Sequence, residues 1–292
     1  MKKTFKTLSN GAWMLQSCLV VILFAAWVIP SKAQDYTLTT GDTSLQVNLA
    51  SPNAGLSQWT IGGINQLEQE WYYLSVAGGA VNSIDTIPTL STPVLNGGSA
   101  PSVSEMYTSN LDYSVSTTYT LTSLSSSVAQ LGTQVAIQNL SSQTQSFNFY
   151  QYSDFWLGGV STGQDFEIVP SGSTTVYQFP TSGAGYLEET VDAGLGVMIT
   201  ETAALYNGTQ LGLENGNPPP NFTDPIGVIG PGNINFGYEF TANLAPGAGM
   251  SFSTIQTVPE SSSLAFISSG ILVLALLYRR GFAFLKNVKT KA

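Results

Sequence analysis

Apolar and polar residues alternate in short runs over most of the chain between residues 35 and 258. A period of two places successive side chains of a strand on opposite faces, one set toward a core and the other toward water. Clear runs lie at residues 113–116, 119–122, 133–138, 146–152 and 165–169. Further strands are expected at residues 174–179, 196–201, 236–241 and 250–257. The pattern therefore predicts a body that consists mainly of β-strands.

Turns rich in Gly and Pro separate these runs, at residues 96–98, 158–159, 170–172 and 245–249. The turn at 245–249 is expected to join the last two strands as a closing hairpin. About twelve short strands with such turns favour an all-β fold, an antiparallel β-sandwich-like body. Residues 203–213 could add one short helix. We expect one body over residues 34–257, and a division within the loop-rich stretch 80–101 is the alternative.

Residues 1–33 have the parts of a secretory signal peptide. Three lysines form a positively charged start, and residues 19–29 are an unbroken apolar run of eleven residues. This run is too short to span a bilayer. Ser31 and Ala33 place small residues three and one before a cut, so we expect the Sec translocon to export the chain and signal peptidase to cleave before Gln34. An uncleaved anchor is the alternative.

Residues 258–292 contain a second apolar run that is followed by cations. The short motif 258–263 is followed by the apolar stretch 264–278 and the basic end 279–292. As a helix the apolar stretch is roughly 22 Å long, whereas a bilayer core is about 30 Å thick. The last fourteen residues carry five cations and no acid. The positive-inside rule therefore predicts a short transmembrane helix with a cytoplasmic end and an outward-facing body.

This tail resembles the PEP-CTERM sorting signal of Gram-negative bacteria, which has a Pro-Glu-Pro motif, a short transmembrane helix and an Arg-rich end. Pro259 and Glu260 match the motif, Ser261 replaces its second proline, and Arg279 and Arg280 match the Arg-rich end. The resemblance implies that an exosortase-type membrane protease removes the tail near Pro259 and Glu260. After transient anchoring in the inner membrane, the body would then reach the cell surface or the extracellular medium. A plain single-pass anchor is the alternative.

The charged residues are segregated along the chain. All nine Lys and Arg lie near the two ends, all eighteen Asp and Glu lie from Asp35 to Glu260, and the chain has no His. No cation occurs between Gln34 and Tyr278, and Cys18 is the only cysteine. The body therefore cannot form Ser-His-Asp or Cys-His sites, the usual zinc or haem sites, or a cationic phosphate clamp. Its negative charge also argues against nucleic acid binding.

Carboxylates make glycoside hydrolysis the one plausible enzyme class, because that reaction can use two acids on either side of the scissile bond. Candidate groups are Glu68 with Glu70, Asp165 with Glu167, and Glu188, Glu189 and Asp192. Residues two apart on a strand share a face, so the first two pairs could each converge. The alternative interpretation is a set of solvated strand faces, and our expectation is that the body is not an enzyme.

Calcium is the most plausible metal for such a body, because Ca²⁺ takes oxygen ligands. The sequence has no dense Asp-x-Asp-x-Asp-Gly loop. A structural or surface calcium site therefore stays open, with no ligand residue assigned and no other cofactor expected.

Aromatic residues offer either sugar-stacking surfaces or core packing. Candidates for sugar stacking are Trp59, Trp71, Tyr72, Tyr73, Tyr107, Trp156 and Tyr186. The cluster Trp71, Tyr72 and Tyr73 is the leading candidate for carbohydrate contact, since consecutive residues of a strand must face both of its sides.

Together these features predict an exported cell-surface or extracellular-matrix protein with a structural or adhesive role. The resemblance to the PEP-CTERM family adds an expected association with exopolysaccharide and biofilm. A carbohydrate-binding or carboxylate-dependent glycoside-acting surface protein is the alternative.

Overall fold

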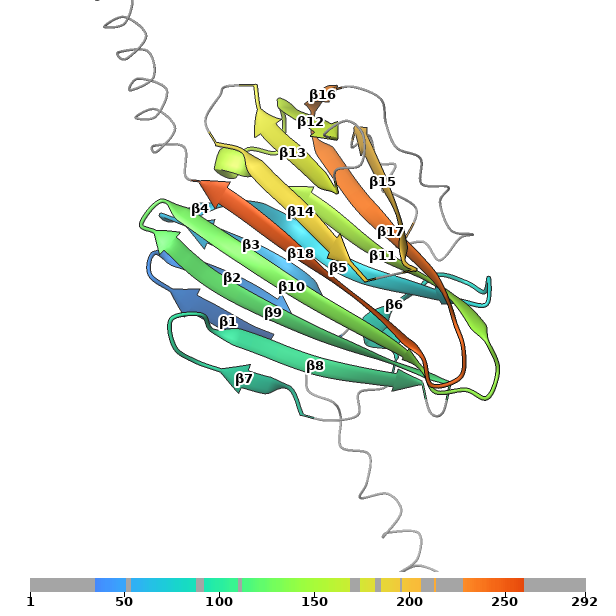
Figure 1. Ribbon diagram of the computed structural model, residues 1–292. Coiled ribbons are helices and arrows are strands. Elements are labelled where there is room, and N and C mark those ends of the chain that lie inside the picture. The colour runs from blue at the N-terminus through green and yellow to red at the C-terminus, as the bar shows by residue number, and fades with distance from the viewer. Residues whose placement is uncertain are drawn as a thin grey trace, which may run out of the picture. The chain divides into compact units, whose positions relative to one another are not determined.

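The computed structural model describes residues 35–50, 54–87, 92–109, 112–168, 174–181, 185–194, 196–205, 213 and 228–259. These residues form an all-β body of two antiparallel sheets, here called A and B, packed as a sandwich (Figure 1). The expected signal peptide and the tail from Glu260 onward lie outside the described residues. Within the described ranges, no helix has the length and apolar character needed to span a bilayer.

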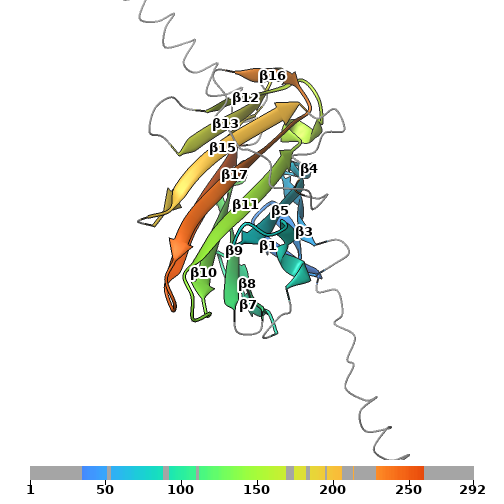
Figure 2. The same cartoon turned by 90° about the vertical axis from the view of Figure 1, so that its right-hand side faces the viewer.

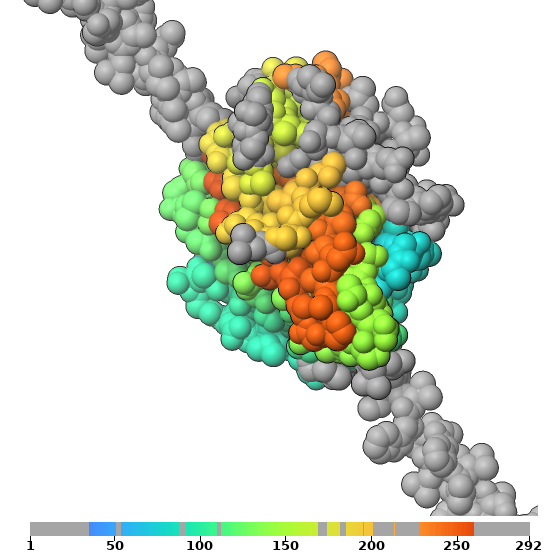
Figure 3. All heavy atoms as spheres, turned by 45° about the vertical axis from the view of Figure 1, so that its right-hand side comes forward, coloured from blue at the N-terminus to red at the C-terminus, as the bar shows by residue number. Residues whose placement is uncertain are grey.

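Sheet A has nine strands, and Figure 2 shows several of them side by side. Their order is β1 (Asp35–Thr40), β2 (Thr43–Asn48), β3 (Gly55–Ile61), β5 (Leu67–Val76), β11 (Gln145–Phe155), β17 (Ile234–Leu244) and β15 (Met198–Leu205). Two short strands lie off this path, β4 (Ile64–Asn65) beside β3 and β6 (Asn82–Ser83) beside β5. In the space-filling view of Figure 3, β15, in gold, lies next to its partner β17, in orange.

Sheet B also has nine strands and lies in front of sheet A in Figure 1. Their order is β16 (Ile229–Gly232), β12 (Gln164–Ile168), β13 (Thr175–Pro180), β14 (Leu187–Ala193), β18 (Gly249–Pro259), β10 (Val128–Asn139), β9 (Tyr113–Ser125), β8 (Ser102–Ser109) and β7 (Val94–Asn96). Two 3₁₀ segments connect strands, η1 (Ile84–Thr86) and η2 (Leu157–Gly159).

The alternation in the sequence places the core between the two sheets. Along β10, buried and less buried side chains alternate over most of the strand, as a sheet with one solvated face requires. Aromatic rings from both sheets meet in the interior: Phe240 of sheet A stacks on Phe252 of sheet B with 3.7 Å between ring centroids. Tyr72 of sheet A stacks on Tyr119 of sheet B at 6.0 Å. These contacts bury apolar surface that would otherwise face water.

The connection at residues 245–249 is not a hairpin. It joins β17 of sheet A to β18 of sheet B, so the chain crosses between the sheets at this turn. Asn139 at the end of β10 holds the crossing: its backbone amide donates to Ala248 O at 2.9 Å, and its side-chain Nδ2 donates to Leu244 O at 2.9 Å. Turn residues alone do not distinguish a hairpin from such a crossing, because both reverse the chain and the sheet that receives the next strand depends on distant partners.

Two other boundaries differ from the sequence-based expectation. The expected helix at 203–213 begins within β15, whose backbone pairs with β17 as far as Leu205. Strand β18 continues through Val258 and Pro259, so the first two residues of the expected tail belong to the folded sheet. Sheet A contains strands from both sides of the stretch 80–101, where the alternative division was placed.

Candidate functional site

Glu70 on β5 and Glu189 on β14 form a fully buried pair of acidic side chains. Both occupy inward positions of their strands, and both are fully buried between the sheets. Glu70 comes from sheet A and Glu189 from sheet B, so the pair links the two layers. No Lys, Arg or His occurs in the body to neutralise them. The oxygens of these two carboxyl groups are therefore satisfied by hydrogen bonds from neighbouring polar side chains instead of by ion pairs.

Two glutamines connect the carboxyl groups. Gln151 Nε2 donates to Glu189 Oε1 at 2.7 Å and to Glu70 Oε2 at 3.3 Å. Gln256 Nε2 donates to Glu189 Oε2 at 3.0 Å and also to Glu70 Oε2. Tyr72 OH donates to Glu70 Oε1 at 2.6 Å. The two carboxyl groups thus share the same amide donors.

Burial raises the pKa of both carboxyl groups. For Glu189 the pKa lies well above the ordinary value, because desolvation is joined by repulsion from Glu70. For Glu70 the hydrogen bonds from Tyr72 and Gln256 act against the raised pKa, but burial dominates. Burial and the neighbouring Glu70 therefore favour the protonated form of Glu189. Because both side chains are completely covered, a substrate cannot reach them in this conformation.

The structure separates the predicted pair Glu68 and Glu70. Across from β5, Asp154 is opposite Gln69 and Phe155 is opposite Leu67, so Glu68 is an extra residue at an irregularity in the pairing. Glu68 points outward and is exposed, whereas Glu70 is buried between the sheets. The expectation that they converge on one face is wrong, because the bulge breaks the period of two.

The other acidic groups are distributed over two faces. Asp165 and Glu167 share the outer face of β12, as their spacing predicted, and both are partly exposed. Glu188 and Asp192 lie on the outer face of β14, whereas Glu189 between them points inward. Among the described residues, no group of three or more Asp, Glu, Cys or His side chains is arranged to hold a metal ion.

The cluster Trp71, Tyr72 and Tyr73 alternates across sheet A. Tyr72 lies in the core, and the other two rings lie on the opposite face of the sheet. All three are buried, with exposed fractions of 1%, 0% and 4%. Trp71 Nε1 donates to Ser83 Oγ at 2.7 Å and to Asp85 Oδ1 at 3.2 Å, beside the turn η1. A sugar cannot reach these rings in this conformation.

The remaining predicted residues are placed as follows. Trp59 and Tyr107 are fully buried in the core, and Trp156 is half-buried next to η2. Pro259 ends β18. The other predicted processing and sorting residues, Ser31, Ala33, Gln34, Glu260, Arg279 and Arg280, lie outside the described residues.

A partly exposed aromatic surface lies at the β12 end of sheet B, on its outer face. Tyr177 and Phe179 project from β13, and Tyr186 precedes β14. The rings of Tyr177 and Tyr186 are 6.5 Å apart between centroids and tilted by 57°. The strands that carry this surface lie side by side in Figure 1. We call these three rings the aromatic platform.

The register between neighbouring strands places carboxylates on both sides of the aromatic platform. Tyr177 lies directly opposite Glu167 on one side and Glu188 on the other, and Phe179 lies opposite Asp165. Opposed residues of an antiparallel pair project from the same face, with Cα atoms about 4.5–5.5 Å apart. Partial burial, followed by the charge of Glu188 and by Tyr186, raises the pKa of the Tyr177 phenol. The platform is therefore a set of rings bordered by hydrogen-bond acceptors.

Sequence reasoning named Tyr186, Asp165, Glu167 and Glu188 separately but missed Tyr177 and their common surface. The period of two in residues 174–179 indicates that Tyr177 and Phe179 share a face. Only the register between β12, β13 and β14 shows which carboxylates lie beside them.

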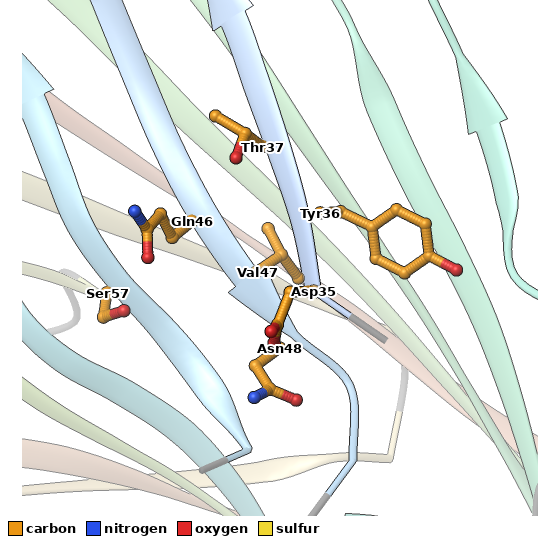
Figure 4. Close-up of a pocket in the computed structure, with 7 residues that line it drawn as sticks. All are labelled: Asp35, Tyr36, Thr37, Gln46, Val47, Asn48 and Ser57. Carbon is orange, nitrogen blue, oxygen red and sulfur yellow. The ribbon is translucent and has the colours of Figure 1, made fainter. Parts of the chain in front are cut away.

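A second feature is a hollow of about 400 Å³ at the other end of the body, on sheet A (Figure 4). Thr37, Gln46 and Ser57 lie in one row across β1, β2 and β3, and Asp35 pairs with Asn48 beside them. The lining is therefore mainly polar. It offers hydroxyl, amide and carboxylate oxygens; Tyr36 and Val47, which also border it, pair with each other on the opposite face of β1 and β2.

No protein-family model and no curated protein matches this chain. Solved structures with a similar fold include a bacterial glucoamylase complexed with acarbose, with a TM-score of 0.53 and 10% sequence identity. That match covers 81% of this chain and 35% of the glucoamylase chain, so this chain spans about a third of that protein. Others are a putative aldose 1-epimerase from Escherichia coli K12 (TM-score 0.44, 11% identity, 78% and 99% coverage) and heparinase III (0.46, 10%, 78% and 36%). At these identities the glucoamylase match shows the sandwich fold alone.

Proposed function

We propose that this protein is exported and that its β-sandwich body binds polysaccharide through the aromatic platform. The observation that carries the proposal is the pair of partly exposed rings, Tyr177 and Tyr186, with Tyr177 directly between Glu167 and Glu188 in the strand register. The apolar face of a sugar ring loses contact with water when it stacks on an aromatic ring. Neighbouring carboxylates can accept hydrogen bonds from sugar hydroxyl groups.

The location of this activity follows from the two ends of the chain. Residues 1–33 support export through the Sec translocon and cleavage by signal peptidase. The tail from Val258 supports transient anchoring in the inner membrane and release by an exosortase-type protease. In this proposal the body acts at the cell surface or in the extracellular matrix, where it holds exopolysaccharide in a structural or adhesive role.

The fold comparison agrees with a carbohydrate ligand. The glucoamylase in the comparison was solved with acarbose, and this chain resembles a part of that protein in fold. This agreement supports the class of ligand proposed here, and the aromatic platform supplies the local argument.

Affinity gel electrophoresis in gels that contain soluble polysaccharides would test the binding proposal. Replacing Tyr177 and Tyr186 by Ala should lower the affinity of a retarding polysaccharide about tenfold for each ring, which corresponds to ~1.4 kcal/mol. Tyr113→Ala is the control for loss of a tyrosine elsewhere, since Tyr113 lies on β9 away from the platform and packs edge to face on Phe147. The proposal fails if no polysaccharide retards the protein, or if the double variant is retarded like the wild type.

Glycoside hydrolysis is the second candidate function. It is favoured by the position of Glu167 and Glu188 on the two sides of one ring, where a bound sugar would lie between two carboxyl groups. Release of reducing ends from a retarding polysaccharide, lost in both Glu167→Gln and Glu188→Gln, would identify an enzyme. Binding without release of reducing ends would limit the function to binding.

A further inference from the structure

We infer that the aromatic platform prefers amino-sugar polymers whose amino groups are free and positively charged. This inference rests on the proposed function and specifies the class of its ligand. It names a chemical class, a polymer of glucosamine-like units without N-acetyl groups, as distinct from neutral or acidic polysaccharides.

The first step is the charge of the surface around the aromatic platform. Asp165, Glu167 and Glu188 are partly exposed, and the chain has no Lys, Arg or His between Gln34 and Tyr278. No side chain of the body can therefore form an ion pair with these carboxylates. A cation that forms such a pair must come from outside the body, and an anionic polymer would be repelled.

The second step is the geometry around Tyr177. Glu167 and Glu188 lie directly across from Tyr177 on its two neighbouring strands, so the ring lies between two carboxylates. Tyr186 places a second ring 6.5 Å from the first. An ammonium group over the face of a tyrosine ring gains a cation–π interaction, and here it also lies near negative charge. A neutral N-acetyl group gains neither of these charge-dependent interactions.

The third step is the row of polar residues that continues from the platform. Glu188 pairs with Thr257, Thr257 pairs with Gln130, and Gln130 pairs with Thr122. Gln130 Nε2 donates to Thr257 Oγ1 at 3.2 Å. From β12 to β9 this row crosses five strand spacings, about 24 Å in total. A row of this length fits an extended oligosaccharide better than a single sugar, so affinity should increase with chain length.

Isothermal titration calorimetry on the purified full-length protein would test the inference, with glucosamine hexamer and N-acetylglucosamine hexamer as probes. At low salt, the deacetylated hexamer should bind at least tenfold more tightly than the acetylated one. The advantage should shrink at 0.5 M salt, because salt screens exposed charges. In the double variant Glu167→Gln/Glu188→Gln, the preference should fall to less than threefold.

The matched control removes the same number of charges elsewhere. Asp42 and Glu68 are exposed and lie away from the aromatic platform, on sheet A. Asp42→Asn/Glu68→Gln should keep the full preference for the deacetylated hexamer. If this control loses the preference to the same extent, the attraction comes from the overall negative charge, and the assignment to the platform is wrong.

The remaining outcomes separate this inference from the function on which it rests. If the two hexamers bind equally and Tyr177→Ala weakens both, the aromatic platform binds carbohydrate but does not select amino groups. If neither hexamer nor any polysaccharide binds, the proposed function itself fails.

Discussion

Replacing Glu189 by Gln tests whether the interior carboxyl pair makes the stability of the fold depend on pH. The pKa of Glu189 is raised by burial and by Glu70 in the folded protein, and in the unfolded chain it returns to an ordinary value near 4.5. A raised folded-state pKa contributes stability that is complete below the unfolded-state pKa and is lost as pH rises through the folded-state pKa. The loss is about 1.4 kcal/mol for each pH unit in which only the folded state keeps the proton.

The Gln variant should therefore have a flatter pH profile than the wild type. Between pH 5 and pH 7, the free energy of unfolding of the wild type should fall by more than that of the variant, with a ceiling of about 1.4 kcal/mol for each pH unit. A Gln at position 189 resembles the protonated carboxyl group. It can accept from the amide of Gln151 or Gln256 and donate to a side-chain oxygen of these residues, both of which are buried without a hydrogen-bond partner. The variant should thus fold normally.

Urea unfolding followed by tryptophan fluorescence gives the required free energies, because Trp59 and Trp71 are buried and report loss of the core. Glu188→Gln is the control, since it makes the same chemical change one residue away on the outer face of β14. Its profile should follow that of the wild type. Parallel wild-type and Glu189→Gln profiles across pH 5–7 would refute a raised pKa of the buried Glu189 carboxyl group.

Three further substitutions have definite expected results. Burial raises the pKa of Glu105 to about 7, so the stability contributed by the protonated carboxyl group is lost as pH rises through 7. Glu105→Gln should therefore melt at a higher temperature than the wild type at pH 8. Equal melting temperatures at pH 8 would contradict this. Trp71→Phe removes the donor to Ser83 and Asp85, so the free energy of unfolding in urea should fall by about 1–2 kcal/mol. In this variant the backbone amides of residues 82–87 should exchange hydrogen faster than those of the other strands. Gly230 has φ of +131°, and an added Cβ would lie 2.5 Å from a backbone oxygen of β12; Gly230→Ala should cost about 1–3 kcal/mol, and an unchanged melting curve would argue against this packing.

Local patterns in the sequence were sufficient to predict the strands, but they did not predict which strands pair. Residues 133–138 and 236–241 lie within β10 and β17, because a period of two is a property of each strand by itself. The turn at 245–249 shows the limit. Its residues specify a reversal of the chain, but the sheet that receives the next strand depends on distant partners. The bulge at Glu68 is invisible for the same reason, since it exists only relative to β11.

The sequence by itself determined which chemistry the body lacks, since the absence of Lys, Arg and His between Gln34 and Tyr278 needs no coordinates. It also predicted the two-faced strands that a sandwich requires. Only the tertiary structure decided which side chains meet. Four strands separated by up to 186 positions bring together Glu70, Gln151, Glu189 and Gln256. Strand register likewise places Tyr177 between two carboxylates, because side-chain neighbours across a sheet are set by long-range backbone pairing.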